Sequence, residues 1–184
     1  MYELAVIHGR FQILHNDHLK YLLAGFARSQ HLVIGITNPD PWRTKFESTD
    51  PSRNSPQNNP LTYFQRYQMI EATLVENKIA PQRYSIVPFP INFPELYKYY
   101  LPTNAVFLLT IYDEWGKDKL TKFQNLGLKT EVMWEKKLSE KGITASEIRA
   151  KISNDEAWES LVPKSVAHFL KKWDIKKVCR NSPL

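Results

Sequence analysis

The chain has 184 residues, 42% hydrophobic and 24% charged, so it fits one globular domain spanning 1–184 with a real core. Its single cysteine, Cys179, excludes an internal disulfide, and the absence of a charged-then-apolar leader and of a membrane-length apolar run predicts a cytoplasmic protein with no membrane partner. The formal charge of +6 suits anionic ligands, but the lysines gather late in the chain, which favours a solvated surface over nucleic-acid binding.

Strand and helix patterns alternate along the chain. Short apolar runs predict strands at 3–8, 31–37, 84–88, 105–110 and 129–133, and helical periodicity predicts helices at 16–28, 63–77, 94–100, 116–125, 145–153 and 164–173. Residues 163–184 are expected to form a C-terminal helix and tail. The alternation predicts an α/β fold, a doubly wound parallel five-stranded sheet with helices on both faces, whose ligands bind beyond the carboxyl ends of the strands.

The first strand leads through Gly9 and Arg10 into the first helix. His15 and His18, three residues apart, share one side of the first turn of that helix. A helix N-terminus presents unpaired N–H groups and a positive dipole end, so we expect an anion to bind here. Taken alone, two histidines at this spacing are also typical of an ordinary surface helix.

Residues 38–62 interrupt the alternation with a stretch rich in Pro, Asn and Ser. A connection of this length in a compact domain is usually functional or disordered, and we expect an active-site loop. Its basic residues Arg43, Lys45 and Arg53 either close over phosphates or stay solvated. Thr62 and Gln65 predict a capping box at the start of the next helix.

Four separated segments resemble those of the nucleotidyltransferase superfamily, in particular the archaeal-type nicotinamide-mononucleotide adenylyltransferases. Residues 8–18 resemble Gly-Arg-Phe-Gln-Pro-x-His-x-Gly-His, and Pro-Ile-Asn-Phe at 90–93 resembles a mononucleotide-binding loop. Thr-Ala-Ser-Glu-Ile-Arg at 144–149 is similar to Ile-Ser-x-Thr-x-Ile-Arg with Ser and Thr exchanged, and 158–166 is similar to the C-terminal stretch. The resemblance implies a Rossmann-like fold.

The resemblance also implies the chemistry: a mononucleotide's phosphate attacks the α-phosphorus of a nucleoside triphosphate and releases pyrophosphate. The family pattern assigns catalytic contacts with the triphosphate to Arg10, His15, His18 and Arg149, and further triphosphate contacts to Gly9, Phe11, Thr144 and Ser146. A salt bridge to Glu147 or Asp155 is the alternative role for Arg149. Mg²⁺ is expected, held mainly by the triphosphate, and we predict no protein metal ligand.

On the acceptor side, the resemblance points to Asn92, Phe93 and Tyr97. Tyr97 stands where the adenylyltransferases have a tryptophan that stacks on nicotinamide, and a tyrosine can also stack on a planar ring. Clustered tyrosines in a short helix can equally belong to the core. Asn92 either binds the acceptor or caps the turn before Pro94.

Two departures from the family pattern bear on the choice of nucleotide. Asp17 replaces the glycine of His-x-Gly-His, where it could act as the N-cap, join the metal shell or signal a different nucleotide. After the fourth strand, Thr110–Gly116 replaces the family's Thr-Gly-Asn, so that Tyr112 and Asp113 are also candidate modifiers of nucleotide choice.

Three functions follow. We favour adenylyl transfer from ATP to nicotinamide mononucleotide, a step of NAD biosynthesis. The alternatives are a nucleotidyltransferase with another base or acceptor, such as CTP-dependent cytidylyl transfer to a phosphate or phosphonate, and a non-catalytic nucleotide-binding or RNA-binding module. The expected partners are ATP or another nucleoside triphosphate and a mononucleotide or other phosphate-bearing small molecule, and formation of a homo-oligomer stays open.

Overall fold

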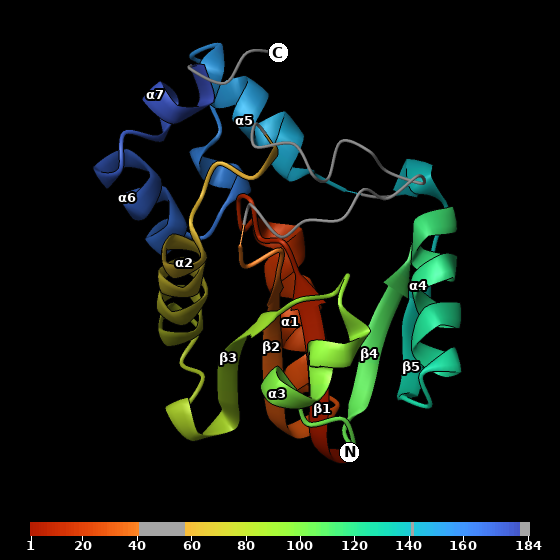
Figure 1. Cartoon of the computed structure of the whole chain (residues 1–184). Helices are drawn as coiled ribbons and strands as arrows, with labels where there is room; N and C mark the ends of the chain where they lie inside the picture. Colours follow the sequence, from red (N-terminus) through yellow and green to blue (C-terminus); the bar gives the residue numbers. More distant parts are fainter. Residues whose placement is uncertain (41–57, 141, 181–184) are drawn as a thin grey trace.

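The structure, a computed structural model, describes residues 1–40, 58–140 and 142–180 (Figure 1). Five parallel strands form one sheet in the order β3-β2-β1-β4-β5. They are β1 (Tyr2–Gly9), β2 (Ser29–Thr37), β3 (Tyr84–Phe89), β4 (Val106–Ile111) and β5 (Lys129–Glu135). The predicted Rossmann-like α/β sheet is confirmed, because each strand lies where an apolar run placed it.

Helices connect the strands and continue after the last one. They are α1 (Asn16–Phe26), α2 (Tyr63–Glu76), α3 (Tyr97–Tyr100), α4 (Glu114–Asn125), α5 (Ala145–Ser153), α6 (Lys164–Lys172) and α7 (Ile175–Arg180), with short 3-10 turns η3 (Pro81–Arg83), η4 (Pro94–Leu96), η5 (Leu138–Glu140) and η6 (Glu159–Leu161). In the part of the chain that the structure describes, none of these helices has the length and apolarity to cross a membrane.

Two helix predictions need correction. The helix expected at 94–100 is divided into η4 and α3, because Pro94 starts a 3-10 turn that α3 continues for four residues only. The expected C-terminal tail contains a further helix, α7, which follows α6 after Asp174 turns the chain with φ 48°. A positive φ at a residue other than glycine ends one helix and allows the next to start in a new direction.

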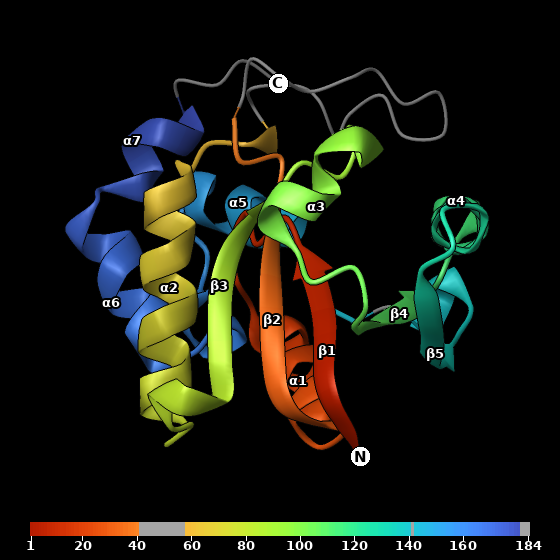
Figure 2. The same cartoon turned by 60° about the horizontal axis from the view of Figure 1, so that its bottom comes forward.

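Hydrophobic clusters cover both faces of the sheet. On one face, α1, α2 and the C-terminal helices pack against strand residues such as Ala5 and Ile7. On the other face, Tyr97 of α3 and Phe123 of α4 pack against Val6 and its neighbours. Figure 2 shows the helices on the two sides of the sheet. Side chains alternate along a strand, so His8 points to the same face as Val6, toward α3 and α4.

The sheet opens between its central strand, β1, and the neighbouring strand β4. β1 pairs with β2 along nearly its whole length, but it pairs with β4 only at Ala5 and Val6. Beyond these pairs the Tyr21 hydroxyl of α1 lies between the strands, where it accepts from the His8 N–H at 3.5 Å and donates to the Leu108 carbonyl at 3.1 Å. Figure 2 shows β4 turned away from β1. Strand order reverses at this point, which is where open parallel sheets bind ligands.

The connection between β2 and α2 is described at its ends only. Residues 41–57, with Arg43, Lys45 and Arg53, lie outside the described residues, so the active-site loop stays a prediction there. At the carboxyl end the predicted capping box is confirmed: Thr62 Oγ1 accepts the Gln65 N–H at 3.2 Å, and Gln65 Oε1 accepts the Thr62 N–H at 2.9 Å.

Candidate active site

His15 and His18 lie together at the N-terminus of α1. His15 is the N-cap, and its Nδ1 accepts the His18 backbone N–H at 3.3 Å, while Nδ1 of His18 accepts the backbone N–H of His15 at 3.4 Å. The two rings are stacked, with centroids 3.7 Å apart. Because each Nδ1 is an acceptor, each neutral ring carries its proton on Nε2. The helix N-terminus therefore holds two imidazoles whose Nε2–H groups are suited to phosphate oxygens.

Phe11 packs against this histidine pair from the side of the core. Its side chain is fully buried, and its ring lies edge-on to the His18 ring at 5.0 Å between centroids. The backbone of Phe11 has φ 52°, a conformation that costs energy for a residue with a side chain and is often found at functional sites. A Cβ on Gly9 would lie 3.0 Å from the Phe11 ring, so glycine leaves room for it. The structure thus places the Phe11 side chain in the core beside the histidines, and a contact of Phe11 with the triphosphate stays a prediction.

Arg149 of α5 contacts the segment 10–15 between β1 and α1, called the histidine loop below, because it ends at His15. Its guanidinium donates to the Gln12 carbonyl, to Asn58 Oδ1 at 2.7 Å and to Ser146 Oγ at 3.1 Å. Burial lowers the pKa of Arg149, but an arginine stays charged at neutral pH. The structure brings Arg149 to the histidine loop, and its described contacts differ from the alternative of a salt bridge to Glu147 or Asp155.

The N-terminus of α5 faces the same region. Thr144 is its N-cap: the hydroxyl accepts the Glu147 N–H at 3.3 Å, and the Glu147 carboxylate accepts the Thr144 N–H at 2.7 Å. The hydrogen bond from the Thr144 hydroxyl is the main cause of the lowered pKa of Glu147. The two helix N-termini, with Thr144 and Ser146 on one and the histidines on the other, therefore converge.

Asp17 joins these two helices. Its carboxylate accepts from Lys20 Nζ at 2.7 Å and from the backbone N–H of Ile143, and the Lys20 hydrogen bond is the main cause of its lowered pKa. A Cβ on Gly142 would lie 2.0 Å from Asp17 Oδ2. Asp17 is not the N-cap, because His15 holds that position. Its carboxylate instead ties the first turn of α1 to the segment that opens α5.

Arg66 of α2 is a buried cation beneath the site. Its side chain is 1% exposed, and the guanidinium donates to the carbonyls of Arg10 at 3.0 Å, Thr37 at 2.7 Å, Asn38 at 2.8 Å and Thr62 at 3.3 Å. Burial, followed by the nearby charge of Arg10, lowers the pKa of Arg66 to about 10. Arg66 therefore stays charged, fixes the chain after β1 and β2, and adds positive potential beside Arg10.

Gln12 holds the segment before α2 against the histidine loop, and sequence reasoning did not single it out. Its buried amide donates to the Leu61 carbonyl at 2.9 Å and accepts the Leu61 N–H at 2.8 Å. Asn58, which accepts from Arg149, belongs to the same segment. The available signal was position: Gln12 follows Gly-Arg-Phe in the motif of the first turn.

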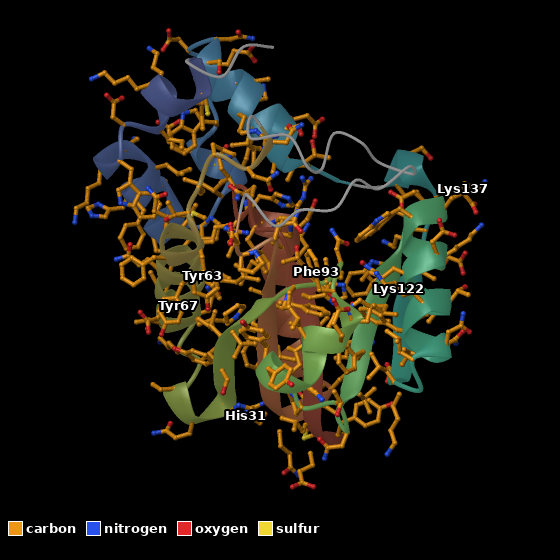
Figure 3. All side chains as sticks on the ribbon, viewed as in Figure 1. His31, Tyr63, Tyr67, Phe93, Lys122 and Lys137 are labelled. Carbon is orange, nitrogen blue, oxygen red and sulfur yellow. The ribbon has the colours of Figure 1, made fainter. Side chains whose placement is uncertain are left out.

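Two acceptor candidates line a cavity, and the third does not. Asn92 and Phe93 border a cavity of about 130 Å³ that residues 38–40 close from the other side. Figure 3 shows Phe93 in front of the sheet, above its middle. Tyr97 is 3% exposed, packs edge-on against Phe89 and donates to the Ile91 carbonyl at 2.5 Å. Of the two roles open for Tyr97, the structure therefore favours the core, and stacking on the acceptor stays an untested prediction.

The segment after β4 has structural partners. Asp113 is the N-cap of α4, with its carboxylate accepting the Gly116 N–H at 2.9 Å. The Tyr112 hydroxyl accepts from the indole N–H of Trp134 on β5 at 2.7 Å. These contacts explain both residue types locally, so an effect of Tyr112 or Asp113 on nucleotide choice stays a prediction.

A larger cavity of about 580 Å³ lies elsewhere, among α5, α6 and α7. Ion pairs cross it from Lys171 to Glu159 at 3.0 Å and from Lys176 to Asp155. Its lining contains no residue of the segments 8–18 and 144–149, both of which the structure describes. The smaller cavity at Asn92 lies at the carboxyl edge of the sheet and is the better candidate for a substrate.

Comparison with known proteins agrees with this geometry. Residues 6–151 match the family described as cytidylyltransferase-like. The chain is 48% identical over 175 residues to a phosphonoformate cytidylyltransferase of Streptomyces viridochromogenes, covering 95% of this chain and 94% of that protein. It is 29% identical to a nicotinamide-nucleotide adenylyltransferase of Thermococcus kodakarensis, covering 89% of this chain and 80% of the relative.

A solved structure shares the fold. The bifunctional NMN adenylyltransferase/ADP ribose pyrophosphatase of Francisella tularensis, solved with AMP and a manganese ion, superposes with a TM-score of 0.67 at 19% identity. The match covers 98% of this chain and 52% of that protein, so the chain spans about half the length of that enzyme. At this identity the likeness concerns the fold alone.

Proposed function

The chain belongs to the cytidylyltransferase-like family of nucleotidyltransferases, and from this premise we propose that it transfers a cytidylyl group from CTP to a small phosphonate or phosphate. The observation that carries the proposal is the 48% identity, along almost the whole of both chains, to a phosphonoformate cytidylyltransferase. The similarity to nicotinamide-nucleotide adenylyltransferases is lower, at 29%. This preference reverses the one that motifs alone suggested, where ATP and nicotinamide mononucleotide came first.

The acceptor side supports a small substrate. The cavity at Asn92 and Phe93 has about 130 Å³, whereas sites for drug-sized ligands begin at about 300 Å³. Nicotinamide mononucleotide belongs to the larger class, and a phosphonate with one further carboxylate is much smaller. The Tyr97 ring, which the family resemblance suggested for stacking on nicotinamide, is buried, and this also supports a different acceptor. Both features favour a compact, strongly anionic acceptor.

The reaction needs positioning and charge stabilisation rather than a covalent enzyme intermediate. A phosphonate oxygen attacks the α-phosphorus of CTP, the bond from that phosphorus to the bridging oxygen breaks, and the electron pair leaves on pyrophosphate. The Nε2–H groups of His15 and His18 would donate to oxygens that gain charge, and Arg10 and Arg149 would offset the charge of the two anions.

Mg²⁺ is part of the proposal as a companion of the triphosphate. The side chains that converge here are imidazoles and guanidiniums, and among the described residues no cluster of three His, Cys, Asp or Glu could hold an ion. This donor set fits a metal that the triphosphate oxygens and water hold. When bound, Mg²⁺ supplies charge neutralisation on the phosphates.

A substrate panel tests the proposal. Pyrophosphate release is measured with CTP or ATP, each combined with phosphonoformate, nicotinamide mononucleotide or buffer, in the presence of Mg²⁺. We expect release with CTP and phosphonoformate to exceed every other pair. Release that is greatest with ATP and nicotinamide mononucleotide would restore the adenylyl interpretation, and nucleotide binding without turnover across the panel would leave a non-catalytic module.

A further inference from the structure

His8 is a buried histidine that the reaction described above does not use. Its side chain is 6% exposed and packs against the rings of Phe89 and Phe123, whose centroids lie 5.3 and 5.6 Å from its own. Within residues 1–40, 58–140 and 142–180, neither Nδ1 nor Nε2 of His8 has a hydrogen-bond partner. Buried polar groups in native proteins are almost always paired, so this ring calls for a partner from outside the chain.

The position of His8 is that of a ligand contact. β1 stops pairing with β4 at Val6, and His8 follows two residues later, where the Tyr21 hydroxyl separates the strands. The opening between these strands is the switch point of the sheet, beyond which ligands of this architecture bind. Because Ile7 faces α1, His8 faces the α3 and α4 side, the side of the acceptor cavity.

The surroundings connect His8 to that cavity. Phe89, which touches His8, is the last residue of β3 and leads directly into the cavity-lining segment 90–93. Gly35 of β2 is the pairing partner of His8 of β1. Because glycine has no side chain, it leaves room for Phe89, which a Cβ at position 35 would approach to 3.0 Å. His8 therefore lies one layer of side chains below the floor of the acceptor cavity.

Cations of α4 lie on the other side of this region. Lys122 Nζ donates to the carbonyl of Ile91, a residue of the cavity wall, at 3.2 Å, and the charge of Lys119 acts on His8. Figure 3 shows Phe93 and Lys122 at a similar height on the same side of the sheet. Positive charge on one side and an unpaired imidazole below suit an anion with two polar ends.

We propose that His8 is a specificity-determining residue for the acceptor, and that one of its ring nitrogens donates a hydrogen bond to an anionic oxygen of a small phosphonate. The inference rests on the proposed function and extends it to the recognition of the acceptor. Burial keeps the pKa of His8 well below its ordinary value, so the ring is neutral and offers one donor and one acceptor. Only a compact ligand can reach a ring buried this deeply.

Steady-state kinetics of His8 variants test the inference. His8→Phe keeps an aromatic ring against Phe89 and removes both nitrogens, whereas His8→Gln keeps a donor. We expect His8→Phe to raise the KM for phosphonoformate about tenfold or more, as for the loss of one buried hydrogen bond, with the KM for CTP within about twofold. His8→Gln should recover part of the loss, and the melting temperature of His8→Phe should not fall, because an unpaired polar ring becomes apolar.

His31 provides the matched control. It lies near the amino end of β2, where its ring contacts the Gln82 carbonyl at 2.9 Å and Ser85 Oγ at 3.0 Å, and Figure 3 shows it near the bottom of the view, well below Phe93. His31→Phe should lower the melting temperature, because it removes satisfied contacts, and should leave both KM values unchanged. The same exchange of histidine for phenylalanine then has opposite signatures at the two positions.

A measurement on the wild-type protein keeps the inference testable if a variant does not fold. Ring ¹⁵N signals of labelled histidines are followed while phosphonoformate is added with a non-hydrolysable CTP analogue. The His8 signals should shift and those of His31 should not. An unchanged His8 signal overturns the inference.

The outcomes separate the two proposals. A wild-type enzyme with no turnover of CTP and phosphonoformate removes the proposed function and this inference with it. An active wild type whose His8→Phe variant keeps its KM for phosphonoformate removes the inference alone. A variant that melts earlier and loses affinity for both substrates assigns His8 a structural role and also overturns it.

Discussion

His15 and His18 hold each other in place: each Nδ1 accepts the backbone N–H of the other residue, and the rings stack 3.7 Å apart. Replacing either ring therefore removes both a donor and part of the helix cap. We predict that His18→Ala lowers kcat on the order of a hundredfold or more, the magnitude seen for donors that stabilise developing charge. It should also lower stability by about 1 kcal/mol through loss of the cap.

A second variant separates these effects. Asn at position 18 can still accept the His15 N–H through its side-chain oxygen, but it does not extend to the Nε2 position. His18→Asn should keep the unfolding free energy of the wild type and lose the same activity as His18→Ala. If denaturant unfolding shows that activity tracks stability across both variants, the donor role of His18 is refuted.

Arg66 and Arg83 form a natural comparison, because each guanidinium donates to backbone carbonyls. Arg83 is half-buried and donates to the carbonyls of Phe26, Ser29 and Gln30 near the amino end of β2. Arg66, in contrast, is buried under the candidate site. Arg66→Met should destabilise the fold by about 3 kcal/mol or more, since it leaves buried carbonyls unsatisfied, and should raise the KM for the triphosphate.

The control, Arg83→Met, should cost about 1 kcal/mol and leave the KM for the triphosphate unchanged. Urea unfolding and steady-state kinetics measure both quantities. Equal kinetic effects from the two variants would show that Arg66 has no special connection with the site.

Asp17 and Gly142 predict an energetic coupling. A Cβ at position 142 would lie 2.0 Å from Asp17 Oδ2, so Gly142→Ala must push the carboxylate away from the N–H of Ile143. We expect Gly142→Ala to cost about 1 kcal/mol in the wild type and almost nothing in the Asp17→Gly background. A double-mutant cycle from urea unfolding measures this coupling, and additive effects would rule out the contact.

Tyr97 separates a core role from a binding role. Tyr97→Ala should destabilise the protein by about 3–5 kcal/mol, as for other large aromatic residues of a core. Tyr97→Phe removes only the hydrogen bond to Ile91 and should cost about 1 kcal/mol, with an acceptor KM close to that of the wild type. A selective rise in that KM for Tyr97→Phe would return the residue to the binding site.

Chelation tests where the metal resides. EDTA should abolish turnover, and added Mg²⁺ should restore it, because the triphosphate carries the ion. The melting temperature of the protein without nucleotide should be the same with and without EDTA, since the described residues contain no cluster suited to a metal. A large shift on chelation would instead indicate a resident ion.

The sequence predicted the sheet because its strands are short apolar runs between amphipathic segments, a pattern set by near neighbours. The family resemblance assigned His15, His18 and Arg149 to one triphosphate, which implies that their segments lie close together. In the structure Arg149 donates to the Gln12 carbonyl, three residues before His15. The sequence left open whether Tyr97 binds the acceptor or belongs to the core, because an aromatic residue near a binding loop has the same local pattern in either role. Asp17 shows the same limit, since its partner Gly142 is distant in sequence and only the fold reveals the contact.

Arg66 also bears on how the chain can vary. Through one guanidinium, α2 is registered against the ends of two neighbouring strands, although the peptide connecting β2 to α2 runs from 38 to 62. Insertions or deletions between residues 41 and 57 should leave the fold intact as long as Arg66 still donates to the carbonyls of Arg10, Thr37 and Asn38. The length of the connection can therefore vary, whereas the position of α2 against the strands cannot. A transplanted loop should function only when it leaves Arg66 within hydrogen-bond reach of these carbonyls.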